Sequence, residues 1–315
     1  MKQNFWTYNK PLSMQGLGGG ANSLNLKSSG GGEVILPNAG NVNGNAQQQE
    51  ITISNFISAG QTLKIPSGLY IWSDNTSNPA LTVDIACTII NEGIIMGRGG
   101  NGGSTVSGSQ AGNDGGSAIK INSGVTGVTI TNNSGAYIFG GGGGGSSGFI
   151  SLESCGGGGG AGGGKGGRGS EETTLTAGGA IGANGSSSPR TYGGVGGENG
   201  GSGGSSNNDN STTDGGASGG GGGRSTSFGS VSAPTVSGGT FASRGGYGGS
   251  HNSTGGNATG GLSASFRGAG GGGGGYGANG GVGKYGNTVG SGGKAIDDSG
   301  VTYTLTNNGT IYGGT

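Results

Sequence analysis

The residue types that carry most enzyme chemistry are scarce in this chain of 315 residues. His251 is the only histidine, and it lies in the stretch GGSHNSTGG, where no apolar neighbour would fix the orientation of its ring. We therefore interpret His251 as a loop residue rather than a general base. The acidic pairs Glu171-Glu172 and Asp297-Asp298 are adjacent in sequence, so in an extended chain their side chains point in opposite directions. The sequence predicts no catalytic constellation, and hence a protein that is not an enzyme.

Metal and phosphate sites are equally unsupported. Cys87 and Cys155 are the only cysteines, and with one histidine they do not make a zinc set; we expect free thiols. Residues 97–102 have the Gly-x-Gly-x-x-Gly spacing of a dinucleotide fingerprint, but no predicted helix follows them. Lys165 follows three glycines as in a Walker loop, but Gly166 stands where that motif requires Ser or Thr. The sequence therefore predicts neither a metal nor a cofactor.

The charge of the chain excludes two further classes of function. Fourteen basic and fourteen acidic residues cancel, and they are scattered along the sequence. Nucleic acids and membrane surfaces select a basic face, which is lacking here. No apolar stretch reaches the length of a signal peptide or a membrane span. We expect a protein that is made in a cytoplasm, does not insert into a membrane and does not bind nucleic acid.

Apolar residues concentrate in residues 33–96, which are predicted to form a small all-β domain. Short runs rich in β-branched and aromatic residues are separated there by Asn, Gly, Pro or Ser, as is typical of strands. The runs are 34–36, 51–53, 63–65, 69–72, 81–83 and 88–90. Residues 1–32 are polar apart from Phe5, Trp6 and Tyr8. These aromatic residues either pack on the next domain or anchor the chain in a partner, and we take 1–32 as an attachment segment.

Glycine dominates the rest of the chain, with 75 of the 91 glycines in residues 97–293. Either this region is a flexible coil, or its backbone is itself the packing material. An internal repeat favours the second reading: GGSAIKINSGVTGVTITNNSGAYIFGG from Gly115 is matched by GGKAIDDSGVTYTLTNNGTIYGG from Gly292, and a shorter copy begins at Thr88. Asn and a following Gly are expected to make a left-handed turn in each copy. Matching β modules thus bracket the glycine region.

The glycines occur in two kinds of run. Pure runs span 140–145, 156–160, 219–223 and 270–275, whereas other runs carry a side chain between glycine pairs, as at Lys165, Arg168 and Val195. An extended helix of the polyproline II type has three residues per turn and no internal hydrogen bonds, so its amides must bond to neighbours. We predict a sandwich of polyglycine II helices over 97–315, with the pure runs innermost. The fold class is therefore mostly β and irregular, with the small β domain first.

Short, dissimilar inserts separate the glycine runs and carry most of the aromatic and charged residues of the region. A rigid scaffold that presents variable loops is typical of a binding module. The insert 224–244 is the longest and the richest in aromatics. The candidate receptor-binding residues are Phe149, Ile150, Arg190, Tyr192, Arg224, Phe228, Phe241, Arg244, His251 and Phe266.

Three stretches resemble the tip adhesins of T-even-like bacteriophage long tail fibres: GIIMGRGGNGG at 93–103, TNNSGAYIFGGGGGG at 131–145 and NNGTIYGG at 307–314. The resemblance covers residue 93 to the C-terminus; residues 1–92 do not match the attachment part of that family. It implies polyglycine II helices with variable distal loops, a place at the distal tip of a trimeric fibre in the virion, and synthesis in the host cytoplasm. The expected partners are the trimeric fibre protein, through the N-terminal part and Phe5, Trp6 and Tyr8, and an outer-membrane protein of a Gram-negative host.

The sequence leaves two other functions open. A glycine-rich structural protein would repeat one short motif, whereas these inserts differ from one another. A tail-spike component that binds or degrades capsule or lipopolysaccharide would need paired carboxylates in a cleft, which the sequence does not indicate. A surface sugar, in place of a protein, also remains possible as the receptor.

Overall fold

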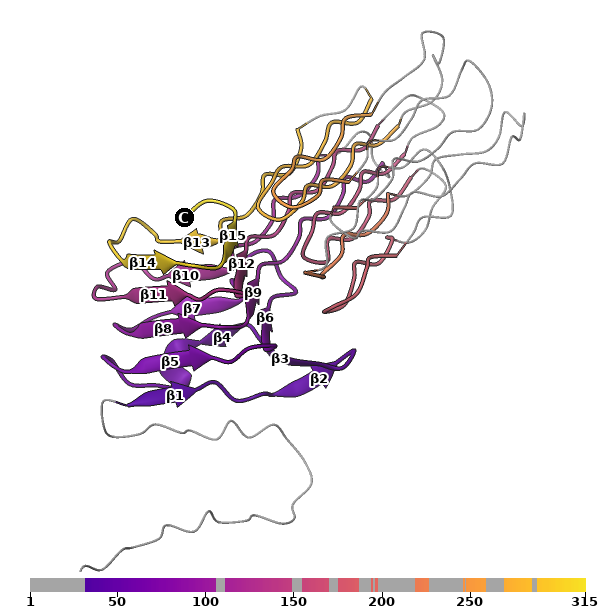
Figure 1. Cartoon of the computed structure of the whole chain (residues 1–315). Helices are drawn as coiled ribbons and strands as arrows, with labels where there is room; N and C mark the ends of the chain where they lie inside the picture. The colour runs from indigo at the N-terminus through magenta and orange to yellow at the C-terminus, as the bar shows by residue number, and fades with distance from the viewer. Residues whose placement is uncertain are drawn as a thin grey trace, which may run out of the picture.

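The chain winds into a three-sided β solenoid, from one side of which a bundle of glycine-rich segments projects (Figure 1). The computed structural model describes residues 32–105, 111–148, 155–169, 175–186, 194, 196–197, 219–226, 246, 248–258, 269–284 and 288–315. Among these residues the regular elements are strands, apart from one short 3-10 turn, η1 (Ile53–Asn55). The expectation of a mostly β protein is confirmed.

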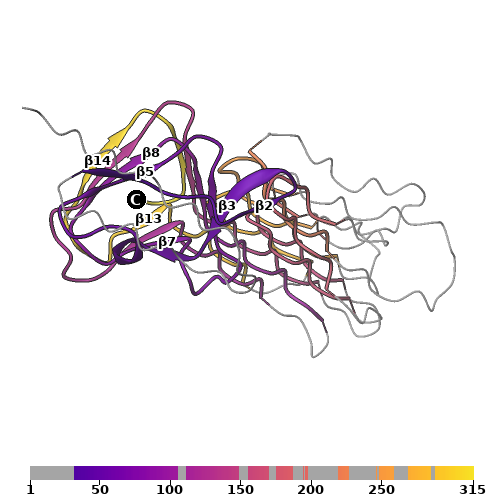
Figure 2. The ribbon, with the colours of Figure 1, turned by 90° about the horizontal axis from the view of Figure 1, so that it is seen from below.

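Three sheets form the sides of the solenoid, and the chain visits them in turn (Figure 2). Sheet A contains β1 (Glu33–Ile35), β5 (Thr62–Ile65), β8 (Thr88–Asn91), β11 (Thr129–Asn132) and β14 (Thr304–Asn307). Sheet B contains β2 (Gly40–Val42), β3 (Asn45–Gln49), β6 (Tyr70–Trp72), β9 (Ile94–Met96), β12 (Tyr137–Phe139) and β15 (Thr310–Tyr312). Sheet C contains β4 (Ile51–Thr52), β7 (Leu81–Val83), β10 (Ile119–Ile121) and β13 (Ile296–Asp297). All paired strands are parallel except β2 and β3.

The core of the solenoid is a stack of aliphatic side chains. Successive residues of a strand point to opposite faces, so alternate apolar residues suffice to fill the interior. The innermost side chains are fully buried: Leu63, Ile89 and Ile130 from sheet A, Ile71, Ile95 and Ile138 from sheet B, and Leu81, Ile119 and Ile296 from sheet C. Each contributes roughly 1.5–3 kcal/mol by leaving water. The predicted runs all fall on or next to strands or η1, whereas the polar β2 and β3 were not predicted.

The copies of the internal repeat are neighbouring turns of the solenoid. Thr129 of β11 pairs with Thr88 of β8 on one side and with Thr304 of β14 on the other, and the three strands stay in register. The C-terminal strands therefore lie directly on the magenta strands of Figure 1, although more than 150 residues separate them in sequence. The sheets do not end at residue 96, so the proposed boundary between 33–96 and 97–315 falls inside one solenoid. Composition did not reveal the single solenoid, because its last strands follow a long glycine-rich stretch of the sequence.

Asparagines close the corner between sheets A and B. Asn91 donates its side-chain amide to Oδ1 of Asn132, and Asn132 donates to Oδ1 of Asn307, both at 2.8 Å. Oδ1 of Asn91 also accepts the N–H of Gly93 at 3.1 Å. The Asn-Gly pattern thus builds a solenoid corner and not a hairpin. The left-handed glycine expected in each copy occurs only at Gly135, with φ of +81°, and not at Gly93 or Gly309. The change of chain direction at this corner is therefore fixed by side-chain hydrogen bonds, where a backbone conformation was expected to fix it.

The corner between sheets B and C gives rise to the glycine region. Between β3 and β4 this corner is Glu50 alone, and between β6 and β7 it is the loop 73–80. Between β9 and β10, and between β12 and β13, the chain leaves on two excursions, 97–118 and 140–295. The strand ladder continues into these corners through the N–H groups of Glu50, Ser73, Gly97 and Gly140, which bond to the carbonyls of Trp72, Met96, Phe139 and Tyr312. We call the glycine segments of both excursions the array.

Hydrogen bonds along the array recur every three residues. In 140–146, the N–H groups of Gly141 and Gly144 bond to the carbonyls of residues 116 and 113. Those of Gly142 and Gly145 bond to the carbonyls of residues 161 and 158. The N–H groups of residues 140, 143 and 146 point to a third side of the segment, where they bond to the carbonyls of residues 312, 278 and 281. Each such segment therefore donates in three directions, and all of these bonds run between segments that are distant in sequence.

The pure glycine runs are the most enclosed parts of the array. Segment 156–162 exchanges backbone hydrogen bonds with six others: 100–103, 142–145, 164–167, 194–197, 220–223 and 271–274. All four pure runs are buried. Where a side chain occurs at every third place it lies towards the outside, as at Lys165, Asn279 and Val282. Val195 is outside the described residues. Glycine is required in the interior, because a side chain would separate the bonded backbones.

Glu50 fastens the loop 73–80 from the corner beneath it. Its carboxylate accepts hydrogen bonds from Oγ of Ser73 at 2.8 Å, from N–H of Asp74 at 3.2 Å and from Nδ2 of Asn78 at 2.9 Å. Partial burial raises the pKa of Glu50, but the three hydrogen bonds lower it by more, so the pKa lies below its usual value. The folded protein therefore favours the ionised carboxylate.

A side chain at Gly142 is expected to disrupt the array. A Cβ there would lie inside the van der Waals distance of the carbonyl oxygens of Gly274 and Gly275. Gly142→Val should cost on the order of 3 kcal/mol or more, because it overpacks the site and breaks lateral hydrogen bonds. Lys165→Val, at an exposed position of another array segment, should change little. Thermal unfolding and amide exchange of 140–145 measure the difference; equal stability of the two variants would contradict this packing.

The lowered pKa of Glu50 predicts a loss of stability in acid. Because the folded pKa is below the unfolded one, the carboxylate stabilises the fold above pH of about 4.3, and this contribution disappears as the pH falls through the folded value. Glu50→Gln should be less stable than the natural protein by about 1 kcal/mol at pH 7. The difference should shrink between pH 5 and pH 3. Unfolding midpoints of both proteins across that range provide the test, and a pH-independent difference would exclude the carboxylate as its cause.

Candidate functional site

The array has one end against the solenoid. Tight turns at 161–164, 180–183, 250–253 and 276–278 lie there. The carbonyl of Ile181 accepts a hydrogen bond from Nδ2 of Asn43 at 3.3 Å. The ring of Tyr276 stacks on Phe139 at 4.5 Å between centroids. These turns are held by sheet B and are not free to present a variable surface.

The other end of the array points away from the solenoid (Figure 1). Gly148 and Cys155 exchange two backbone hydrogen bonds, of 3.0 and 3.1 Å, and so close the pair of segments joined by 149–154. Five more pairs of oppositely directed segments are joined at the same end, through 106–110, 170–174, 187–193, 259–268 and 285–287. Four of the dissimilar inserts, those that include 149–154, 170–174, 187–193 and 259–268, are therefore attached at the end remote from the sheets.

Most of the predicted receptor-binding residues lie outside the described part of the chain. These are Phe149, Ile150, Arg190, Tyr192, Phe228, Phe241, Arg244 and Phe266. The predicted attachment residues Phe5, Trp6 and Tyr8 also lie outside it. Their roles remain predictions.

Arg224 is placed by the structure where a receptor would not reach it. Its side chain is only 7% exposed, and it donates Nε to the carbonyl of Gly162 at 3.0 Å and Nη2 to that of Ser73 at 3.1 Å. The guanidinium also lies over the ring of Trp72, with 4.5 Å between its central carbon and the ring centroid. Burial lowers the pKa of Arg224 to about 10, and the charge of Arg98 acts in the same direction. The receptor-contact role suggested for Arg224 is corrected to a contact between the array and the solenoid.

His251 is also at the solenoid end. It occupies a left-handed conformation in the turn 250–253, with φ of +52°. Its ring meets that of Tyr312 edge-on, at 5.9 Å between centroids. This position argues against a receptor contact, because Tyr312 belongs to the outer face of sheet B.

No reaction centre is visible in the described residues. Cys87 and Cys155 are buried and do not form a disulfide, as expected, and burial raises the pKa of Cys87 to about 11. Asp297 forms an ion pair of 2.9 Å with Lys294, which accounts for one of the two adjacent carboxylates. Across this part of the chain, no group of three or more His, Cys, Asp or Glu residues is arranged to hold a metal ion. Nor does any helix within it have the length and apolarity needed to cross a bilayer.

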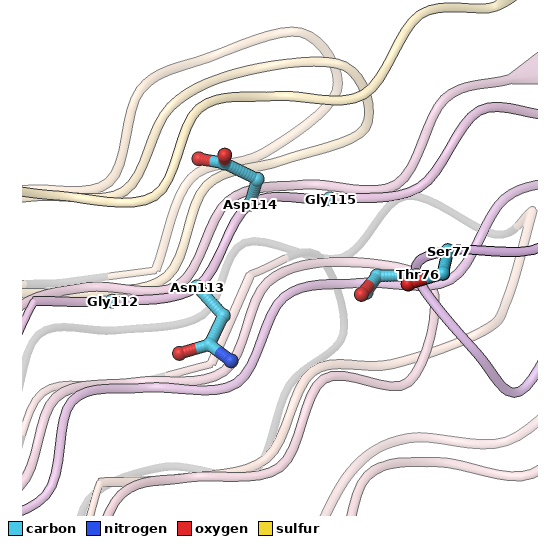
Figure 3. A pocket seen from close by; sticks show the side chains of 6 residues that line it. All are labelled: Thr76, Ser77, Gly112, Asn113, Asp114 and Gly115. Atoms are coloured by element: carbon cyan, nitrogen blue, oxygen red, sulfur yellow. The ribbon is translucent and has the colours of Figure 1, made fainter.

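A polar pocket of about 410 Å³ lies between the loop 73–80 and the segment 112–115. Thr76, Ser77, Asn113 and Asp114 line it together with two glycines. Figure 3 shows the side chains of Asn113 and Asp114 leaving their segment in opposite directions. Oδ1 of Asp114 accepts the N–H of Ser291 at 2.7 Å, so this carboxylate holds two array segments together. The pocket offers no converging acid and base.

Sequence reasoning missed the residues that join the array to the solenoid. Arg98 is 8% exposed and donates Nε to the carbonyl of Asp74 at 3.1 Å. Tyr276 is fully buried and donates its hydroxyl to the carbonyl of Ser225 at 3.0 Å. A bulky residue directly before or after a glycine run was the available signal, since such a residue stands where the array turns.

A comparison with protein-family models finds one that matches residues 34–219, more than half of the chain, and it describes the phage tail fibre adhesin Gp38. The match starts within β1, so it includes the strands before residue 93 that the sequence resemblance did not cover. Neither the curated proteins nor the solved structures contain a significant match.

Proposed function

The chain belongs to the phage tail fibre adhesin Gp38 family, and we propose that it binds an outer-membrane protein of a Gram-negative host through the inserts at the remote end of its array. Membership of this family makes it a component of the phage tail that serves attachment to the host. The observation that carries the finer proposal is the position of the inserts. Six of them join array segments at the end that points away from the solenoid.

The array is proposed to consist of polyglycine II helices. The period of three residues in its hydrogen bonds supports this, because such helices have three residues per turn and bond only to neighbours. A scaffold of this kind needs no hydrophobic core of its own. It can therefore carry inserts of any composition at its open end without loss of stability, as recognition of variable receptors requires.

Eight of the ten candidate residues remain in this proposal once Arg224 and His251 are removed. Phe149, Ile150, Arg190, Tyr192 and Phe266 belong to inserts that join array segments at the remote end. The longest insert carries Phe228, Phe241 and Arg244; it begins beside the solenoid, after the buried Arg224, and rejoins the array at Gly246, which bonds to Gly270 at the remote end. Aromatic and arginine anchors usually carry most of the energy of an interface, so these three residues are the candidates within that insert. Binding without turnover is part of the proposal. Incubation with host capsule or lipopolysaccharide should release no sugar; its release would favour the tail-spike alternative.

The remaining partner is proposed to be the trimeric fibre protein, held through residues 1–32. The support is the cluster Phe5, Trp6 and Tyr8 and its distance along the chain from every array segment. This arrangement would place the adhesin at the distal tip of the fibre, with the array directed towards the host.

Exchange of the longest insert should change the host. The exchanged segment is 227–244, which leaves the buried Arg224 and its two neighbours in place. Replacement by the corresponding insert of a related phage should move adsorption to the host of that phage, with thermal stability unchanged. Lys120→Gln, at an exposed position of sheet C, is the control and should leave adsorption as it was. If adsorption ignores every insert but responds to changes in residues 33–96, the solenoid reads the receptor and the proposal fails.

Removal of residues 1–32 should abolish incorporation into the virion. The solenoid and the array should still fold, because the first strand begins at Glu33 and the described core is built from Val34 onward. Copurification with phage particles and binding of the free protein to host outer membranes are the two measurements. Normal incorporation of the shortened protein would place the attachment surface elsewhere.

A further inference from the structure

The loop 73–80 lies between the two parts of the protein. It occupies the corner between sheets B and C, one turn before the first excursion into the array. The N–H of Ser73 bonds to the carbonyl of Met96, the last residue before that excursion. The loop is therefore the part of the solenoid on which the base of the array rests.

Glu50 holds this loop in a single shape. Its carboxylate binds the loop at Ser73, Asp74 and Asn78. The backbone of Glu50 is in the left-handed region, with φ of +46°, which a glutamate rarely adopts. Such an outlier persists only where the surroundings impose it, and it often marks a functional constraint. Glycine or asparagine would relieve the strain at this corner, but neither side chain could reach all three partners in the loop.

The loop also binds two buried arginines through its backbone carbonyls. The carbonyl of Ser73 accepts Nη2 of Arg224 at 3.1 Å, and that of Asp74 accepts Nε of Arg98 at 3.1 Å. Both guanidinium groups also donate to the carbonyl of Gly162, at 3.0 Å from Arg224 and 3.4 Å from Arg98. Arg98 belongs to the first excursion, and Arg224 and Gly162 belong to the second. One loop thus ties both excursions to the solenoid.

These hydrogen bonds are better suited to fixing the orientation of the array than to stabilising the folded state. A guanidinium is a planar fork whose donors fix direction, whereas the stacked rings of Phe139 and Tyr276 tolerate sliding and rotation. Burying two like charges opposes folding, so the arginines add little net stability for the desolvation they undergo. Buried at 7% and 8% exposure and directed at backbone carbonyls, they are suited to select one arrangement of the array.

We infer that Glu50 and the loop 73–80 form a positioning element. Through Arg98 and Arg224, this element sets the direction in which the array leaves the solenoid. In the proposed function, on which this inference rests, the same element aims the inserts at the host surface. The loop touches no receptor; it acts through the two arginines.

The test compares Arg224→Met and Glu50→Gln with Lys165→Met as a matched control. Methionine keeps an apolar stem over Trp72 but removes the fork, and Lys165 is an exposed cation of the array. Spin labels at Lys120→Cys on sheet C and Val282→Cys on the array report the distance between the two parts, since both positions are exposed. The native cysteines are 2% exposed, so they should not take up the label in the folded protein. The distance distribution should broaden and shift in the first two variants and stay unchanged in the control.

Amide exchange of 140–145 separates positioning from simple folding. In a positioning role, protection of these glycines persists while the distance distribution broadens, and virions carrying the variant adsorb more slowly. The broadening in the double variant should be smaller than the sum of the two single effects, because both residues act through one loop. An unchanged distribution in either folded variant, or loss of protection together with the broadening, overturns the inference. If the natural protein fails to bind host outer membranes, the proposed function fails instead, and the label distances still decide the role of the loop.

Discussion

Every part of the array depends on the lateral hydrogen bonding of bare backbone. A glycine buries no side chain and loses more conformational freedom on folding than any other residue, so a single segment has nothing to stabilise it. Segment 156–162 is stable only because six neighbours satisfy its amides and carbonyls. The same dependence explains the absence of side chains from the pure runs, where a Cβ at Gly142 or Gly160 would displace a carbonyl of the next segment. The array therefore forms as a whole or not at all.

The solenoid supplies the ends from which such an array can start. Parallel strands in strict register place Met96 and Phe139 side by side, so the excursions that follow them begin as neighbours. The return strands β10 and β13 pair in register as well, which brings the two excursions back side by side. Alignment of the first and last residues of each excursion removes part of the entropy that the glycine segments would otherwise lose on ordering. The β core is thus a template for the array as well as its support.

Parts of this arrangement could be predicted from the sequence. The likeness between 115–140 and 292–314 anticipated matched β modules, and these are adjacent turns with Thr129 opposite Thr304. The layering of pure and interrupted glycine runs also agrees with the burial of 140–145 and the exposure of Lys165. The single solenoid was not predicted, because parallel pairing leaves no local sign of which strands are neighbours. For the site, the inserts could be recognised by composition, but the burial of Arg224 could not.

Local sequence patterns specify three components: glycine runs whose spacing suits three-fold extended segments, strand-forming repeats at both ends of the glycine region, and dissimilar inserts between the runs. These are local properties, set by the absence of Cβ atoms and by the alternation of apolar residues. Three outcomes depend on the three-dimensional fold: the repeats become turns of one solenoid, six inserts emerge at the remote end, and Arg224 faces inward. The reason is that these outcomes rest on contacts between residues far apart in the chain, such as the hydrogen bond from Arg224 to Ser73 across 151 positions. No local pattern encodes such a contact, since any buried arginine must find its acceptors in whichever backbone the fold brings beside it.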